Sequence, residues 1–198
     1  MARKLPKVLS EAEQERFLAA FFSQTSPGKL PRYRSPRRDY VLARLILGTG
    51  LRVSEALALR REHVDLEDCQ LIVREGKGSK DRVLWYDDDV AELLERWLAK
   101  NNPENAPRQH VFTTSSGRPV NRRDAYTAIR RRARKAQIAE WEKVGVHTLR
   151  HTFATNLLRR THDIFLVKEA LGHADVATTM IYLHLVKDDL KNALRRTV

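Results

Sequence analysis

The sequence holds a single cysteine, Cys69, so no internal disulfide can form. A lone thiol suits a reducing compartment, and we therefore expect a cytoplasmic protein. Long apolar runs are also missing: stretches such as 41–43 and 45–47 fall far short of the roughly 20 residues that a membrane-spanning helix needs. The charged N-terminus is not followed by the apolar segment of a signal peptide. These features argue against a disulfide-held secreted domain and against an integral membrane protein.

Acidic residues are outnumbered. The 198 residues include 37 Lys and Arg against 25 Asp and Glu, which gives a net charge of +12 and an isoelectric point near 10.2. Hydrophobic residues make up 42% and aromatic residues 7%, as in an ordinary globular domain. Basicity of this size favours a polyanionic partner, with nucleic acid ahead of an anionic membrane surface. Composition alone leaves open that the charge is merely solvated.

The pattern of apolar residues predicts an α+β protein that is mainly α, with helices around a small antiparallel sheet. A β-hairpin is expected from strands 70–74 and 81–86, joined by a glycine-bearing, lysine-rich tip at 75–80. Residues 111–113 are expected to form a further short strand. The expected helices are 11–22, 37–47, 53–59, 87–100, 121–137, 147–159, 164–171, 178–183 and a tail helix from 187.

Residues able to do chemistry gather in the stretch Val146–Phe153. On a helix, His147, Arg150 and His151 share a face because they are three and four positions apart. A zinc helix of the metalloprotease type needs Glu directly after the first histidine, and Thr148 stands there instead. An imidazole beside a guanidinium suits a phosphate better, although by itself this motif is more often structural.

Three further blocks accompany this stretch: Gly48–Leu57, the hairpin tip Gly76–Lys80, and Leu171–His184. Taken in order, the four blocks resemble the tyrosine recombinase (phage integrase) family, and most closely its Xer-type members. The intervals of 23 residues from Arg150 to His173 and of 9 from His173 to Tyr182 agree with that family. The resemblance extends from about Leu9 to the C-terminus and implies the family's catalytic fold.

The resemblance also implies a role for each residue. Tyr182 would attack the scissile phosphate of DNA and form a 3′-phosphotyrosyl bond, without metal, ATP or any other cofactor. Arg52 and Arg150 would bind the non-bridging oxygens, with His173 donating to the same phosphate. The remaining assignments are Lys77 as general acid for the leaving 5′-oxygen, His147 as general base, Glu55 as a supporting carboxylate, and His151 and His184 as structural support.

A basic segment marks the expected DNA interface. Residues 121–135 carry seven Arg or Lys and one acid, Asp124. In the family the helix at this place enters the major groove, so Arg122 and Arg123 in its first turn are the foremost candidates, followed by Arg130 and by Lys80 on the hairpin tip. Some of these arginines are expected instead to be solvated or to pair with Glu140 and Glu142.

The resemblance makes 1–198 a catalytic domain and places no N-terminal core-binding domain in this chain. Its partner would be double-stranded DNA, with a homotetramer on synapsed DNA formed through helix 187–198, in the cytoplasm and nucleoid of a prokaryote or on a mobile element. The expected function is site-specific DNA recombination or integration. A type IB topoisomerase, which uses a similar residue set, and a catalytically silent DNA-binding regulator remain alternatives.

Overall fold

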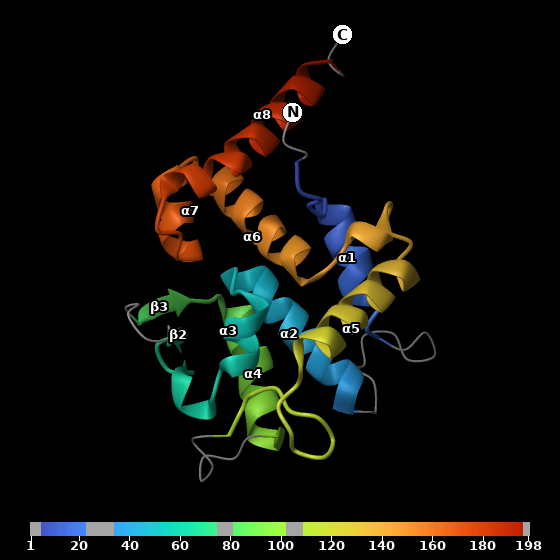
Figure 1. The fold of residues 1–198 in the computed structure, drawn as a ribbon, viewed down its shortest axis with the longest axis vertical. Helices are drawn as coiled ribbons and strands as arrows, with labels where there is room; N and C mark the ends of the chain where they lie inside the picture. Colours follow the sequence, from blue (N-terminus) through green and yellow to red (C-terminus); the bar gives the residue numbers. More distant parts are fainter. Residues whose placement is uncertain (1–4, 23–33, 75–80, 102–108, 196–198) are drawn as a thin grey trace.

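The computed structural model describes residues 5–22, 34–74, 81–101 and 109–195, and it is mainly helical with one small sheet (Figure 1). The main helices are α1 (Glu11–Ala19), α2 (Arg34–Thr49), α3 (Val53–Ala58), α4 (Asp88–Asn101), α5 (Arg122–Lys135), α6 (Val146–Thr161), α7 (Ile164–Leu171) and α8 (Met180–Arg195). Short 3-10 turns lie at Arg61–His63, Trp141–Lys143 and Val176–Thr178. The expected α+β, mainly α class is confirmed.

Side-chain caps explain why several helices begin where the sequence predicts. Ser10 accepts from the N–H of Glu13, whose carboxylate accepts in return from the N–H of Ser10. Asn121 caps α5 by accepting from the N–H of Asp124. Asp163 caps α7, which ends at Gly172 with a φ of +63°. Helix 164–171 is thus confirmed with its predicted bounds.

The sheet has three antiparallel strands in the order β1 (Val64–Asp65), β2 (Gln70–Val73) and β3 (Arg82–Trp85). The β2–β3 hairpin was predicted and is confirmed, with Ile72 opposite Val83. Strand β1 was not predicted. The strand expected at 111–113 is wrong, because this segment makes only isolated bridges, one between His110 and Arg60 and one between Thr113 and Pro119.

Two hydrophobic clusters share α6. The larger cluster contains residues of the helices from α1 through α5, of the sheet, and of the first turn of α6, where Val146 and Leu149 belong to it. The smaller cluster joins the rest of α6 to α7 and α8, and Tyr182 is one of its buried members. Figure 1 shows α6 running between these two parts of the molecule. The site described below lies where the two clusters meet.

The C-terminal region corrects a second prediction. Two separate helices were expected, at 178–183 and from 187, whereas α8 is one continuous helix over Met180–Arg195. The cap at Thr179 follows the 3-10 turn Val176–Thr178, so the helix starts later than predicted. None of the helices among the described residues is both long enough and apolar enough to span a membrane.

Candidate active site

Arg52 and Glu55 are fixed by a tight turn between α2 and α3. Gly50 occupies this turn with a φ of +68°, and a Cβ there would lie 2.4 Å from the ring of Phe153, so only glycine fits. Arg52 then caps α3, donating through its backbone N–H to Glu55 Oε2 at 2.7 Å and through Nη1 to Glu55 Oε1 at 2.7 Å. Glu55 is thereby held as a carboxylate with both oxygens engaged.

Arg150 is buried, with 5% of its surface exposed, at the centre of this arrangement. It donates from Nη1 to the carbonyl oxygen of Gly50 and from Nη2 to that of Leu171, the latter at 2.7 Å. Burial, reinforced by the charge of Arg52, lowers the pKa of Arg150 to about 10, while Glu55 opposes the shift. The guanidinium stays protonated at neutral pH and its orientation is fixed by two backbone carbonyls.

His173 follows the end of α7 and is anchored by a second buried group. Its Nδ1 lies 2.9 Å from Oγ1 of Thr179, a fully buried residue. Burial, and then the charges of Arg150 and Arg52, lower the pKa of His173 to about 4. The imidazole is therefore neutral at pH 7. In the tautomer whose Nδ1 accepts from Thr179, the ring carries its proton on Nε2, where it can donate to an anionic ligand.

Tyr182 is buried in the smaller cluster, with 1% of its surface exposed. Its hydroxyl lies 2.9 Å from Nδ1 of His151. Burial raises the pKa of Tyr182, whereas the nearby Arg150 lowers it. Burial lowers the pKa of His151 to about 4, and His147 and Arg150 add to this effect, so the ring is neutral and its Nδ1 can accept a hydrogen bond from the phenol. Sequence reasoning assigned His151 only structural support and missed this contact.

Two of the three residues of α5 that were predicted to contact DNA lie beside the predicted general base. Arg122, Arg123 and His147 line one surface hollow of about 440 Å³, together with Val53, Tyr126, Thr127 and Val146. Burial lowers the pKa of His147, and the charges of Arg122 and Arg150 lower it further. A neutral imidazole at this place can accept a proton. The hollow thus joins the basic end of α5 to the start of α6.

Taken together, the described part of the chain brings Arg52, Glu55, Arg150 and His173 into one cluster, with the helix of Tyr182 beside it. Arg52 Nη2 even reaches the carbonyl oxygen of Gly172, at 3.4 Å, next to His173. These residues come from three segments: the first lies about a hundred positions before Arg150, and His173 lies 23 positions after it. The arrangement offers several hydrogen-bond donors to a tetrahedral anion, and a phenol nearby.

Comparison with known proteins agrees with this geometry. A model of the phage integrase family matches residues 7–188. The chain belongs to the phage integrase family. The tyrosine recombinase XerD of Ralstonia nicotianae is 34% identical over 193 residues, which cover 95% of this chain and 59% of that protein. This chain therefore spans about three fifths of the length of that relative.

Solved structures of phage integrase family members show the same fold. A XerA recombinase superposes with a TM-score of 0.79 at 32% identity, covering 98% of this chain and 66% of that one. A XerH recombinase bound to its palindromic difH substrate, in a post-cleavage complex, gives a TM-score of 0.78 at 32% identity, covering 96% and 53%. The fold is thus that of a tyrosine recombinase catalytic domain.

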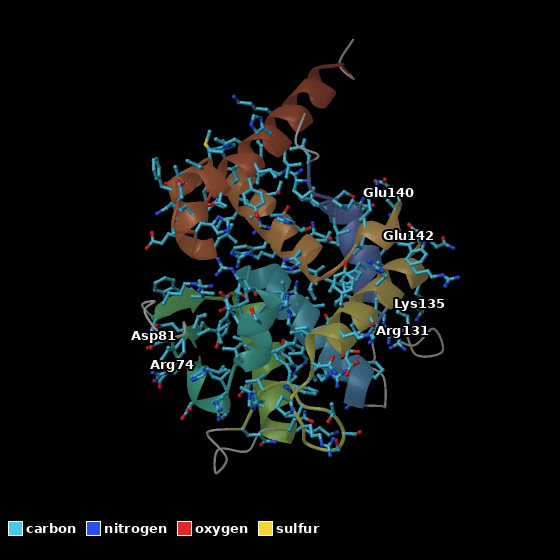
Figure 2. The ribbon with its side chains drawn as sticks, viewed as in Figure 1. Arg74, Asp81, Arg131, Lys135, Glu140 and Glu142 are labelled. Atoms are coloured by element: carbon cyan, nitrogen blue, oxygen red, sulfur yellow. The ribbon has the colours of Figure 1, made fainter. Side chains whose placement is uncertain are left out.

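The other predicted contacts of this phage integrase family member have mixed outcomes. Arg130 stacks over the Tyr126 ring at 4.8 Å and donates to its hydroxyl at 3.1 Å, which ties it to its own helix. Lys135 donates to the carbonyl oxygen of Ala20, and Glu140 pairs with Lys143. Figure 2 shows Arg131 and Lys135 on the side of α5 away from the β2–β3 hairpin. Lys77 and Lys80 lie outside the described residues.

Sequence reasoning missed two residues of the cluster. Thr179 holds His173, and its signal was present as a paired threonine before the tyrosine helix. Arg82, the first residue of β3, donates from Nη2 to Glu55 Oε2 at 2.8 Å. It lies on the same strand face as the buried Leu84.

Proposed function

We propose that this chain is the strand-cleaving and strand-rejoining domain of a site-specific DNA recombinase, with Tyr182 as nucleophile. The observation that carries the proposal is the cluster of Arg52, Arg150 and His173 around Glu55, beside the helix of the buried Tyr182. Membership of the phage integrase family supports it, and so does the DNA-bound state of the XerH relative.

In the proposed reaction the phenolic oxygen of Tyr182 attacks the scissile phosphorus as the bond to the 5′-oxygen breaks. The products are a 3′-phosphotyrosyl ester and a free 5′-hydroxyl, and reversal of this step rejoins a strand without an external energy source. Arg52 and Arg150 stabilise the charge on the non-bridging oxygens, and His173 donates from Nε2. The proton for the leaving oxygen is assigned to Lys77.

The tyrosine proton needs an acceptor. The family resemblance assigns this role to His147, whose lowered pKa favours the neutral form that a proton acceptor needs. In the described conformation the nitrogen in contact with the hydroxyl is Nδ1 of His151. We therefore propose that His151 holds Tyr182 before cleavage and that His147 takes the proton once the hydroxyl has turned toward the phosphate.

DNA would lie across the hollow between α5 and α6. Arg122 and Arg123 stand in the first turn of α5, where the helix dipole disfavours cations. Two cations at the end of the helix that disfavours them indicate a partner that supplies negative charge there. We assign this partner as the phosphate backbone of double-stranded DNA, with Arg130 limited to positioning Tyr126 and Lys80 contributing from the hairpin tip.

Assembly forms part of the proposal. Figure 1 shows the C-terminal part of α8 extending beyond α6 and α7. We propose that segment 187–198 binds a second copy of the chain in a tetramer on two synapsed duplexes. We place this assembly on the nucleoid, in the cytoplasm. Light scattering with DNA should show a mass above one chain per duplex, and removal of 188–198 should reduce it to one.

The decisive test is covalent capture. The chain is incubated with a pool of nicked duplexes whose arms are randomised. The nick allows a short 5′-ended fragment to be released after cleavage, which makes cleavage irreversible. A protein–DNA adduct that is absent with Tyr182→Phe is expected, and sequencing of the trapped strand identifies the site. An adduct that persists in Tyr182→Phe would refute the assignment of the nucleophile.

Two alternatives to this function are distinguished by adding a plasmid relaxation assay and a DNA-binding assay to the capture experiment. A type IB topoisomerase would relax supercoiled plasmid lacking the captured site. A silent regulator would retain duplex in a binding assay but trap no strand. Replacing His147 or His151 by Ala then separates their roles. Loss of the base, assigned here to His147, should slow cleavage at saturating DNA over the whole neutral pH range.

A further inference from the structure

Arg82 is a charged residue in an interior position. Its side chain is 14% exposed, and it projects from the start of β3 toward the same side as Leu84, away from the exposed Val83 and Trp85. A buried guanidinium is unfavourable unless an anion and hydrogen bonds replace its water. The groups that Arg82 contacts therefore indicate the role of this side chain.

The first partner is Glu55, which serves more than one cation. Arg82 Nη2 lies 2.8 Å from Glu55 Oε2, and Arg52 Nη1 lies 2.7 Å from Oε1. Arg150 Nη1 lies 3.9 Å from the same Oε2, beyond hydrogen-bond distance. One carboxylate thus faces three guanidinium groups, and the bond to Arg82 occupies the oxygen nearest to Arg150.

The second partner is the backbone beside His173. A Cβ placed on Gly172 would lie 2.9 Å from both Cζ and Nε of Arg82. The guanidinium therefore packs directly against the Cα of Gly172, one residue before His173. Arg82 is thus in contact with two of the segments that build the cluster, α3 and the end of α7, while belonging to neither.

We propose that Arg82 is a positioning residue that keeps Glu55 from capturing Arg150. Without Arg82, Glu55 Oε2 loses its charged hydrogen-bond donor and keeps only the backbone N–H of Arg52. Arg150 then needs to move only about 1 Å to reach ion-pair hydrogen-bond distance. That movement would draw Nη1 off the carbonyl oxygen of Gly50 and turn the guanidinium toward the protein. This inference rests on the proposed function, in which Arg150 binds the scissile phosphate. Arg82 itself does not contact the DNA.

The inference makes a specific genetic prediction. If Arg82 acts by satisfying Glu55, then removing the charge of Glu55 should repair the loss of Arg82. We expect Arg82→Gln to slow covalent capture at saturating DNA by about 100-fold, the scale of losing one preorganised donor. The double variant Glu55→Gln/Arg82→Gln should recover at least about tenfold of that loss. Arg82→Lys keeps the charge but not the planar contact with Gly172, and it should be intermediate.

Arg74 provides the matched control. It lies directly after β2 in the same hairpin, its side chain is 65% exposed, and it pairs with Asp81 rather than Glu55. Arg74→Gln removes the same charge, but from an exposed position. It should therefore leave the cleavage rate within about twofold of the unmodified chain. DNA affinity of all variants should change little, which separates a positioning effect from lost binding.

The outcomes are distinguishable. Equal or poorer capture by the double variant than by Arg82→Gln would overturn the inference while leaving the proposed function intact. If the unmodified chain traps no DNA, the proposed function fails, and calorimetric titration with inorganic phosphate tests Arg82 independently. Phosphate affinity should then fall in Arg82→Gln and recover in the double variant, and no recovery would reject the positioning role.

Discussion

The hydrogen bond between Tyr182 and His151 allows a prediction about stability that is separate from the proposed catalytic role of Tyr182. Tyr182→Phe keeps the ring and removes the hydroxyl, which is 2.9 Å from His151 Nδ1 in an almost fully buried position. The ring nitrogen then loses its partner, at a cost of about 1–2 kcal/mol. For a chain of this size we expect the melting temperature to fall by about 2–8 °C.

The measurement is thermal or urea unfolding of the variant beside the unmodified chain, together with the capture assay. His151→Phe and the double variant His151→Phe/Tyr182→Phe complete a cycle. Replacing both partners by apolar rings should be less harmful than the sum of the single changes, with a coupling of about 1 kcal/mol. A Tyr182→Phe protein that traps no DNA yet unfolds at the original temperature would show that the hydroxyl is not bonded to His151 in solution.

Three further predictions follow from the same contacts. Burial holds the pKa of His151 near 4 in the folded chain, against about 6.5 when unfolded, so its contribution to stability should be complete above pH 6.5 and be lost toward pH 4, by at most about 3 kcal/mol. His173, whose pKa is also about 4, adds a parallel acid loss, so urea unfolding of His151→Phe should show a smaller acid loss than the unmodified chain, and an unchanged acid limb would contradict this. Gly172→Ala should lose stability by about 1–2 kcal/mol from its φ of +63° and lose cleavage through the contact with Arg82; thermal unfolding and capture measure both, and a fully active variant would contradict the close packing. Arg122→Gln should reduce the salt slope of DNA binding by about 1 and move the acid limb of cleavage to higher pH, since the charge of Arg122 lowers the pKa of His147; Arg131→Gln on the outer side of α5 should do neither, and equal effects from both would indicate non-specific attraction.

The predictability of the fold followed how local its signals were. Helix 164–171 was predicted with its bounds because Asp163 and Gly172 are caps whose effect lies within one turn. The break expected before residue 187 was wrong, since α8 is held as one helix partly by packing against α6, which sequence spacing does not show. The prediction of a strand at 111–113 was also wrong. The apolar residues of this segment pack in the core, but no continuous neighbouring strand pairs with it.

The site divides in the same way. Arg52, Arg150 and His173 stand in recognisable blocks, and they meet in the structure. Arg82 escaped notice because residues 83 to 86 are apolar or aromatic on both faces of the strand, so alternation could not tell inward from outward. The contact of His151 was hidden for a related reason: on α6 it neighbours both Arg150 and His147, and only the position of α8 decides which histidine meets Tyr182.

That last contact has a consequence for how the site works. The cations are held ready by groups of the protein itself: the carbonyl oxygens of Gly50 and Leu171 for Arg150, and Glu55 for Arg52. Such preorganisation means that little rearrangement is needed when phosphate charge develops. Tyr182, in contrast, is 1% exposed and bonded within the smaller cluster. If Tyr182 is the nucleophile, its hydroxyl has to be uncovered before attack, and we expect this to require a shift of α8. In the proposed reaction, release of Tyr182 from His151 then becomes a step that DNA binding has to drive, and cleavage is expected to be slower than binding.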